Sequence, residues 1–361
     1  MRVTTIVACL VLSSSSILVA TPASADPPPA CGSTLTVDTV LRADLVCAGP
    51  GLLLAPGVDL NLKGHTVKGT AGGVGVSVAS AGDATVKNGT LTGWDTALGV
   101  YAATDMGHGP LHVEKVSFRD NGTGLNASDP DNGTLHTKDV TITGSTFTGS
   151  REFALVSAFL PEFDISSTTF MDNRTALSGG TSTLTNTRFV RNGVAISVAE
   201  SRATVVRSTF IDNPVAVDAS WFSFGELAIT DSTFTGSDVA VRSETVHADI
   251  SGSMFVGNTT AVTIGIAGAT VVGNTFRANG TTLRLVEEEF SPTLVQDNTF
   301  RLNGDGLVLA VTSGSVVSVG GNDARRNTGW GINVSGVSDL GGNTARGNGN
   351  EPQCVGVVCT P

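Results

Sequence analysis

The chain has few of the residues on which many protein functions depend. Its 361 residues include three tryptophans, one tyrosine and five histidines, and only 15% of all residues are charged. Lysine and arginine together number 21 against 32 aspartates and glutamates, which gives a formal net charge of −11. Because this balance is acidic, it argues against binding of nucleic acid, or of any other polyanion, by bulk electrostatic attraction.

Long apolar runs are also missing beyond the first 25 residues, since no later run approaches the ~18 apolar residues that a membrane span needs. Residues 1–25 combine Arg2, an apolar stretch and a small-residue triplet at 23–25, a pattern typical of a cleaved secretory signal. We therefore expect a secreted, extracellular protein with no membrane span, in which residues 26–30 form a short linker.

Cysteine is scarce, and its count fits export. Removal of the signal would take Cys9 with it and leave four cysteines. In an exported chain an even number indicates disulfides, and local pairing of Cys31 with Cys47 and of Cys354 with Cys359 is the simplest arrangement. No metal site is predicted from these cysteines, because neither a CxxC spacing nor a nearby histidine supports one.

What the chain does have is an internal repeat of about 20–30 residues. Its anchor is phenylalanine nine times and then alanine twice, at positions 118, 147, 170, 189, 210, 234, 255, 276, 300, 324 and 345. Five residues before each anchor stands an aliphatic, mostly β-branched residue, which prefers a strand. Three residues after it stands asparagine or serine, and asparagine tolerates a left-handed backbone in a turn. A fixed period of this kind indicates stacked repeats.

The spacing between turn residues is too short for helical repeats, and a second strand follows each turn. The sequence therefore predicts an all-β fold, a solenoid of short stacked parallel strands in which neighbouring coils lie ~4.8 Å apart. In the last four repeats the residue two before the anchor is asparagine, and such stacked amides can form a hydrogen-bonded ladder. We place an N-terminal cap at 31–59, the coils at 60–348 and a C-terminal cap with its local disulfide at 349–361.

The repeated pattern, for example Val205, Phe210 and Asn213, resembles that of right-handed parallel β-helix (PbH1) repeat proteins of the pectin-lyase-like superfamily. The resemblance covers about residues 50–348 and implies a single-stranded right-handed parallel β-helix of about 12–13 coils, capped at both ends. Enzymes of this superfamily act on polysaccharides at the outer face of one parallel sheet, although the fold also hosts adhesins and inert scaffolds.

The resemblance thus implies a protein that binds or processes extracellular polysaccharide. If the chain is an enzyme, it implies a polysaccharide lyase or a glycoside hydrolase. The alternative is a non-catalytic structural or adhesive rod outside the cell, and the scarcity of outward charge and of aromatic residues favours it. We expect a monomer whose partner is an extracellular polysaccharide or cell-wall glycan, not nucleic acid.

Outward positions of the second strand are mostly small or neutral, and charge appears there only at Asp218, Arg242 and Arg284. We predict these three as candidate catalytic residues. Glu244 follows Arg242 by two residues, and Trp221 lies in the same coil as Asp218, so both are candidate substrate-binding residues, the indole as a surface on which a sugar stacks. An exposed salt bridge beside a hydrophobic loop is the alternative interpretation.

Calcium-binding lyases of the superfamily hold the ion with clustered acidic residues on that sheet. Here the outward row contains one aspartate, Asp218, rather than a cluster. No metal ligands are therefore predicted, and no cofactor is assigned; calcium is the one cofactor that the resemblance and the acidic composition leave open.

A stripe of arginine follows the anchors of the last four coils, at Arg277, Arg301, Arg325 and Arg346. Stacked ~4.8 Å apart, four guanidinium groups would form a positive ladder on an acidic protein. Like charges so close repel one another unless something pairs them. We hypothesise that these residues bind an anionic polymer such as an acidic wall glycan; the alternative is that nearby carboxylates neutralise them.

Overall fold

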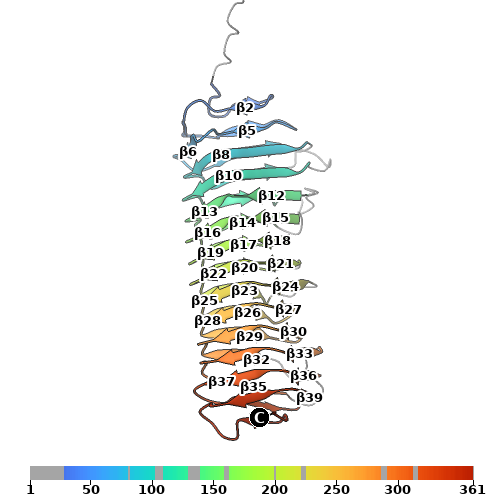
Figure 1. The fold of residues 1–361 in the computed structure, drawn as a ribbon. Coiled ribbons are helices and arrows are strands. Elements are labelled where there is room, and N and C mark those ends of the chain that lie inside the picture. The colour runs from blue at the N-terminus through green and yellow to red at the C-terminus, as the bar shows by residue number, and fades with distance from the viewer. Residues whose placement is uncertain are drawn as a thin grey trace, which may run out of the picture.

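All regular structure in the described part of the chain is β-strand. The computed structural model describes residues 28–79, 82–101, 109–128, 139–157, 162–198, 201–220, 225–285, 291–311 and 316–360. Within these ranges there are 41 strands and no helix. They wind into an elongated rod of about 13 turns (Figure 1). The predicted all-β parallel β-helix is confirmed.

The strands form three parallel stacks along the rod, and each stack contributes one strand to a typical coil. The first stack consists of β1 (Thr34–Leu35), β4 (Leu52–Leu54), β7 (Val74–Ala79), β9 (Thr96–Tyr101), β11 (Thr123–Asn126), β14 (Phe153–Val156), β17 (Thr175–Ser178), β20 (Val194–Ser197), β23 (Val215–Ala219), β26 (Val239–Ser243), β29 (Thr260–Ile264) and β32 (Thr281–Leu285), followed by β35 (Leu307–Ala310), β38 (Ile332–Ser335) and β41 (Cys354–Val355).

The second stack consists of β2 (Thr39–Val40), β5 (Leu60–Asn61), β8 (Ala84–Thr92), β10 (Leu111–Arg119), β12 (Asp139–Thr143), β15 (Glu162–Ser166), β18 (Thr181–Thr185), β21 (Ala203–Val206), β24 (Glu226–Thr230), β27 (His247–Ser251), β30 (Ala269–Val272), β33 (Thr293–Gln296), β36 (Val317–Gly320) and β39 (Ser338–Gly341).

The third stack consists of β3 (Leu45–Cys47), β6 (Thr66–Gly69), β13 (Thr146–Thr148), β16 (Thr169–Met171), β19 (Arg188–Val190), β22 (Thr209–Ile211), β25 (Thr233–Thr235), β28 (Met254–Val256), β31 (Thr275–Arg277), β34 (Thr299–Arg301), β37 (Asp323–Arg325) and β40 (Thr344–Arg346). Strands β8 and β10 are nine residues long and pair with strands of both the second and the third stacks, so these two stacks merge there.

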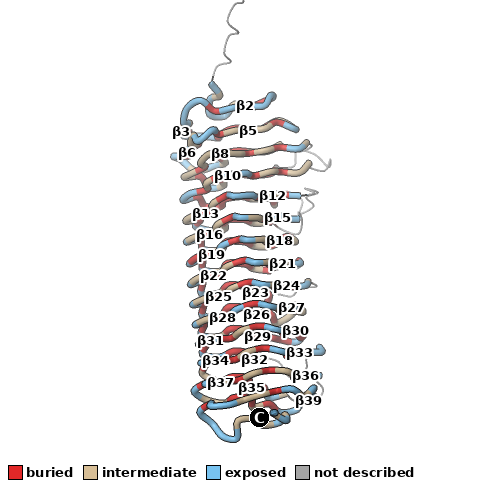
Figure 2. The backbone as a smooth tube through the Cα atoms, viewed as in Figure 1, coloured by how far each residue is buried: buried red, intermediate tan, exposed pale blue. Residues whose placement is uncertain are grey.

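The anchor phenylalanines form one continuous stack in the core. All nine are buried, and each ring lies parallel to the next with centroids between 4.3 and 5.0 Å apart. Buried residues line the interior of the rod along its length (Figure 2). From β13 onward each strand of the third stack carries its anchor inward, so the residues on either side of the anchor lie on the outer face, since side chains alternate along a strand. Most of them are exposed or partly exposed, although Val190 is buried.

Left-handed turns bound every short strand of the third stack from β13 onward. Each coil has one residue of positive φ three positions before the anchor and one two positions after it, as at Asp231 and Gly236 around Phe234. The sequence suggested this conformation for the asparagine three residues after the anchor. That prediction is wrong, since the left-handed residue lies two residues after the anchor. The left-handed residue precedes the asparagine, because the asparagine side chain is turned into the core.

Those asparagines, and the ones two residues before the last anchors, form two buried ladders. For example, the side-chain oxygen of Asn279 accepts hydrogen bonds from the backbone N–H and from the side-chain amide of Asn258. The side-chain amide of Asn279 in turn donates to the side-chain oxygen of Asn303. Asn274 and Asn298 are joined in the same way, which confirms the predicted amide ladder.

Both ends of the rod carry a disulfide, and the pairing is the one predicted. Cys31 is bonded to Cys47 and Cys354 to Cys359. None of the described residues forms a helix long and apolar enough to cross a membrane. The proposed signal at 1–25 lies outside the described residues.

Candidate functional site

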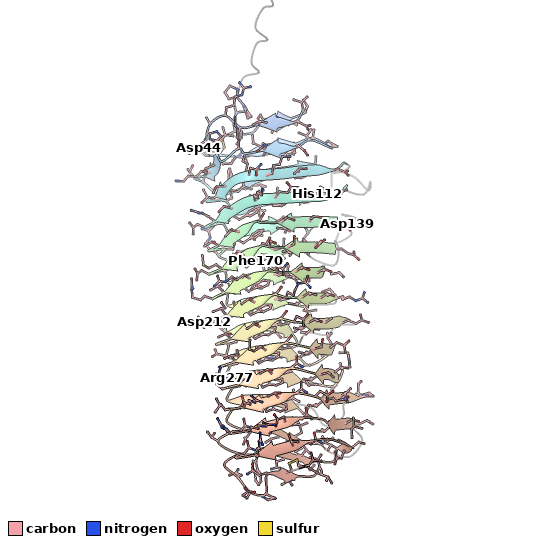
Figure 3. All side chains as sticks on the ribbon, in the orientation of Figure 1. Asp44, His112, Asp139, Phe170, Asp212 and Arg277 are labelled. Atoms are coloured by element: carbon pink, nitrogen blue, oxygen red, sulfur yellow. A yellow bond between two sulfur atoms is a disulfide. The ribbon has the colours of Figure 1, made fainter. Side chains whose placement is uncertain are left out.

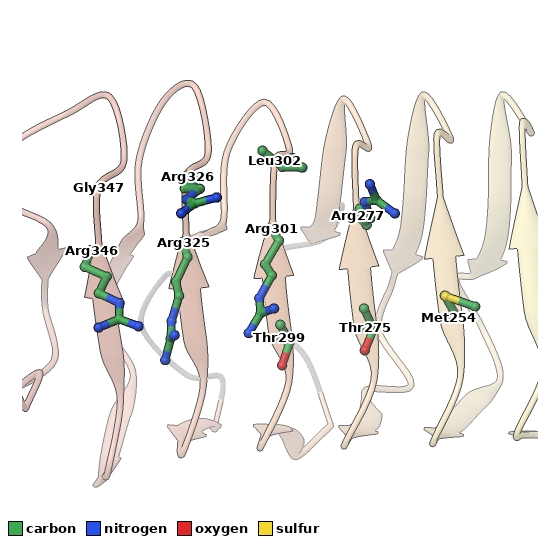
Figure 4. A pocket seen from close by; sticks show the side chains of 10 residues that line it. All are labelled: Met254, Thr275, Arg277, Thr299, Arg301, Leu302, Arg325, Arg326, Arg346 and Gly347. Carbon is green, nitrogen blue, oxygen red and sulfur yellow. The ribbon is translucent and has the colours of Figure 1, made fainter.

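The four predicted arginines lie side by side on the outer face of the third stack. Strands β31, β34, β37 and β40 pair in parallel, and the register places Arg277 opposite Arg301, Arg301 opposite Arg325 and Arg325 opposite Arg346. Each follows its inward anchor by one residue and therefore points outward. We refer to these four residues as the arginine ladder (Figure 4).

The arginine ladder lines a surface groove of about 890 Å³. Its lining combines cationic, hydroxyl and apolar side chains. The residues are Met254, Thr275, Arg277, Thr299, Arg301, Leu302, Arg325, Arg326, Arg346 and Gly347. Arg326, in the left-handed turn after β37, was not predicted from the sequence. Its position two residues after the anchor, beside the arginine stripe, is the signal that could have found it.

Two members of the ladder share one carboxylate. Asp323, on the same strand as Arg325, accepts a hydrogen bond from the Nε of Arg325, and its other oxygen lies 3.5 Å from an Nη of Arg301. Within the described residues no carboxylate lies within ion-pair distance of Arg277 or Arg346. Among the described residues, the suggested neutralisation of the stripe is therefore partial at the centre of the ladder and absent at its two ends.

Several opposing effects act on the Asp323 carboxyl. Partial burial raises its pKa, whereas hydrogen bonds from Arg325 and Thr344 and the charge of Arg325 lower it, and their sum holds the pKa below its usual value. The side chain of Asp323 is only 20% exposed. The group is therefore ionised at neutral pH and oriented by its neighbours.

The predicted catalytic residues lie on a different face, the first stack. Asp218 on β23 is directly opposite Arg242 on β26, with 3.7 Å between an Asp218 oxygen and a guanidinium nitrogen. Glu244, two residues after Arg242 along the chain, has a carboxylate oxygen 3.9 Å from the Nε of Arg242. The structure thus brings Asp218, Arg242 and Glu244 together.

Part of the Asp218 carboxylate is already engaged within the protein. One carboxylate oxygen accepts hydrogen bonds from the hydroxyl and the backbone N–H of Ser220, at 2.6 and 3.2 Å, and the side chain is 15% exposed. Arg284 lies two coils from Arg242, with Thr263 between them, so it does not join the Asp218 group. Trp221 lies outside the described residues.

An acidic patch on the second stack was missed by the sequence analysis. Asp139 is opposite Glu162, and Asp164 follows on the same strand; the three line a hollow of about 350 Å³. In Figure 3 Asp139 and Arg277 lie on opposite sides of the rod. In the described ranges no three acidic, histidine or cysteine side chains are close enough to hold a metal ion.

Residues 50–225 match a family model described as "Right handed beta helix region". No curated protein sequence matches the chain significantly.

Two solved structures are similar in shape. One is a variant of the periplasmic alginate epimerase AlgG, with 14% identity and a TM-score of 0.43 over 79% of this chain and 77% of that one. The other is tailspike protein 3 of bacteriophage CBA120, with 12% identity and a TM-score of 0.45 over 88% of this chain and 57% of that one. Neither similarity is high enough to assign an activity.

Proposed function

Because the chain is a right-handed parallel β-helix protein, we propose that it is an extracellular protein that binds an anionic polysaccharide along the arginine ladder. One observation supports this most directly. Arg277 and Arg346, the two end members of the arginine ladder, line a groove of about 890 Å³. Neither has a carboxylate partner among the described residues.

The groove has the chemistry that an acidic glycan requires. A guanidinium group binds a carboxylate, sulfate or phosphate through two parallel N–H groups, and it is less strongly hydrated than an ammonium group. A linear polymer laid along the rod meets a new guanidinium at each coil, every ~4.8 Å. The threonine hydroxyls of Thr275 and Thr299 can bond sugar hydroxyls, while Met254 and Leu302 offer apolar contact to the sugar rings.

The net charge of −11 makes the position of these arginines informative. An acidic protein repels a polyanion at long range, so binding depends on a local concentration of positive charge. The disulfides Cys31–Cys47 and Cys354–Cys359 support an extracellular site of action, since such bonds persist in oxidising compartments.

Processing of the polysaccharide is the second candidate function. It is favoured by Asp218 and Glu244, two carboxylates that both lie within 4 Å of the Arg242 guanidinium and could act as acid and base. The low exposure of the Asp218 side chain, 15%, and the two hydrogen bonds that Ser220 donates to one of its oxygens favour the first candidate instead, because a reactive carboxylate needs access to the substrate.

The test uses the mature protein, residues 26–361, and immobilised polygalacturonate, with dextran as the neutral polymer. In one variant all four ladder arginines become serine. We expect retention on polygalacturonate to fall roughly tenfold or more, since several exposed charge contacts of a few tenths of a kcal/mol each are lost together.

The matched control removes the same charge from exposed arginines elsewhere. It replaces Arg42, Arg119, Arg174 and Arg188 by serine. Equal retention of the two variants would reject the ladder as the binding site, and no retention of the wild type would favour the inert rod. Release of shorter products, with or without calcium, and its loss in Asp218→Asn would favour processing.

A further inference from the structure

One acidic side chain interrupts the cationic face of the arginine ladder. In the row next to the ladder, the register aligns Thr275, Thr299, Asp323 and Thr344. Threonine thus occupies three of these four equivalent positions, and aspartate occupies the third in the series. A threonine is sterically accepted at this position, so the strand itself does not require a carboxylate.

Asp323 organises the two central guanidinium groups. It pairs with Arg325 on its own strand and with Arg301 on the neighbouring one, and it accepts a hydrogen bond of 2.9 Å from the hydroxyl of Thr344. In Figure 4 the guanidinium groups of Arg301 and Arg325 extend back along their strands, in the direction of Thr299. The guanidinium group of Arg277 extends in the opposite direction, toward the turns that follow the strands. Their N–H groups are therefore partly used by the protein itself.

Among the described residues, the groove consequently presents positive charge without a carboxylate partner at Arg277 and Arg346, the two ends of the ladder, and at Arg326 in the turn after β37. Arg277 and Arg346 are three coils apart, which corresponds to roughly 14 Å at ~4.8 Å per coil. Between them lies a pair of arginines whose charge is reduced by one carboxylate that is ionised at neutral pH.

We propose that Asp323 is a specificity residue that makes the arginine ladder prefer a linear glycan with widely spaced anionic groups and uncharged sugars between them. This inference rests on the proposed function. A polymer with a charge on every sugar brings an anionic group next to Asp323. The Asp323 carboxylate repels this group, and the two compete for the N–H groups of Arg301 and Arg325. An uncharged sugar at the same place can donate its hydroxyls to the carboxylate.

The experiment compares two anionic polymers at equal ionic strength. Polygalacturonate carries a carboxylate on every sugar, and hyaluronan carries one on every second sugar. The wild type is expected to bind hyaluronan more tightly per carboxylate. Asp323→Thr, which restores the residue of the neighbouring coils, and Asp323→Asn are each expected to strengthen polygalacturonate binding roughly fivefold, the effect of one close unit charge near a surface, and to leave hyaluronan binding nearly unchanged.

Asp164→Asn is the control, since it removes one exposed negative charge from the second stack. An equal gain for both polymers in the Asp323 variants, or the same gain in Asp164→Asn, would show a general charge effect and overturn the inference. If both polymers bind through Arg277 and Arg346 and the Asp323 variants keep the wild-type ratio, only the spacing preference fails. If neither polymer binds the wild type, the proposed function fails with it.

Discussion

The side-chain oxygen of Asn298 accepts two hydrogen bonds from Asn274 in the preceding coil, at 2.9 Å from the backbone nitrogen and 3.1 Å from Nδ2. Asn298 in turn donates to the backbone oxygen of Val271 and to the side chain of Asn322. Both asparagines are about 1% exposed. The ladder therefore satisfies buried N–H groups at a turn, where strand pairing does not supply an acceptor.

Replacement of Asn298 by alanine should destabilise the fold by about 2–3 kcal/mol, because two donors of Asn274 lose their acceptor in a buried place. Urea unfolding measures the change. Asn298→Asp should cost more, since it buries a charge. The exposed Asn350 is the control, and Asn350→Ala should stay within ~0.5 kcal/mol of the wild type. Equal effects at the two positions would contradict a structural role for the ladder.

Phe210 lies at the middle of the phenylalanine stack, with ring centroids 4.8 Å from Phe189 and 4.5 Å from Phe234. Phe210→Ala should cost about 3–5 kcal/mol, because it leaves a cavity between two rings that the rigid coils cannot close. Phe210→Leu should cost much less. Amide exchange should rise most in the coils next to 210, since each coil contacts only its neighbours; a uniform rise along the rod would contradict this.

Ala278 has a positive φ of 55° and is exposed in the turn after β31. The left-handed conformation costs alanine about 1–2 kcal/mol, whereas glycine adopts it freely. Ala278→Gly should therefore stabilise the protein by up to ~1 kcal/mol after the greater entropy of glycine in the unfolded chain is counted. The change is read from thermal unfolding. Ala248→Gly, at a buried position within strand β27, is the control and should destabilise.

Asp339 holds the C-terminal segment to the last coil. Hydrogen bonds from the backbone N–H groups of Val358 and Gly341 hold the pKa of Asp339 below its ordinary value of 3.8. Because the folded-state pKa is depressed, the stabilisation is complete above the unfolded-state pKa and is lost as the pH falls through the folded-state pKa. As the pH falls from 5 to below 3.8, the Val358 amide should therefore lose protection from exchange progressively.

In Asp339→Asn the same amide should be less protected at pH 5 and should show little further pH dependence. The Asn350 amide, which donates to the backbone oxygen of Gly329, is the internal reference. A wild-type profile at Val358 that is parallel to that of the variant would show that Asp339 does not hold the segment through its charge.

Much of the architecture was readable because the repeat makes each residue's neighbours predictable. In a solenoid, residues at the same place in successive coils are adjacent, so the spacing of Phe276 and Phe300 already gave the register of Arg277 and Arg301. The same logic aligned Asp218 with Arg242. The backbone of the turns was less readable. The sequence suggested a left-handed conformation for the asparagine, but the residue before it adopts that conformation, and this residue can be aspartate, arginine, alanine or leucine.

The sequence by itself determined the β-helix, its coil period and which side chains face outward, because each of these follows from local periodicity, and it indicated the disulfide pairing, because the cysteines lie in two pairs that are close in the chain. Only the tertiary structure decided how the outward charges are used. Asp323 reduces the positive charge at the centre of the arginine ladder, whereas Arg277 and Arg346 have no carboxylate partner among the described residues, and Ser220 hydrogen-bonds one oxygen of Asp218. Such pairing depends on side-chain rotamers and on contacts between coils, and neither is set by the repeat.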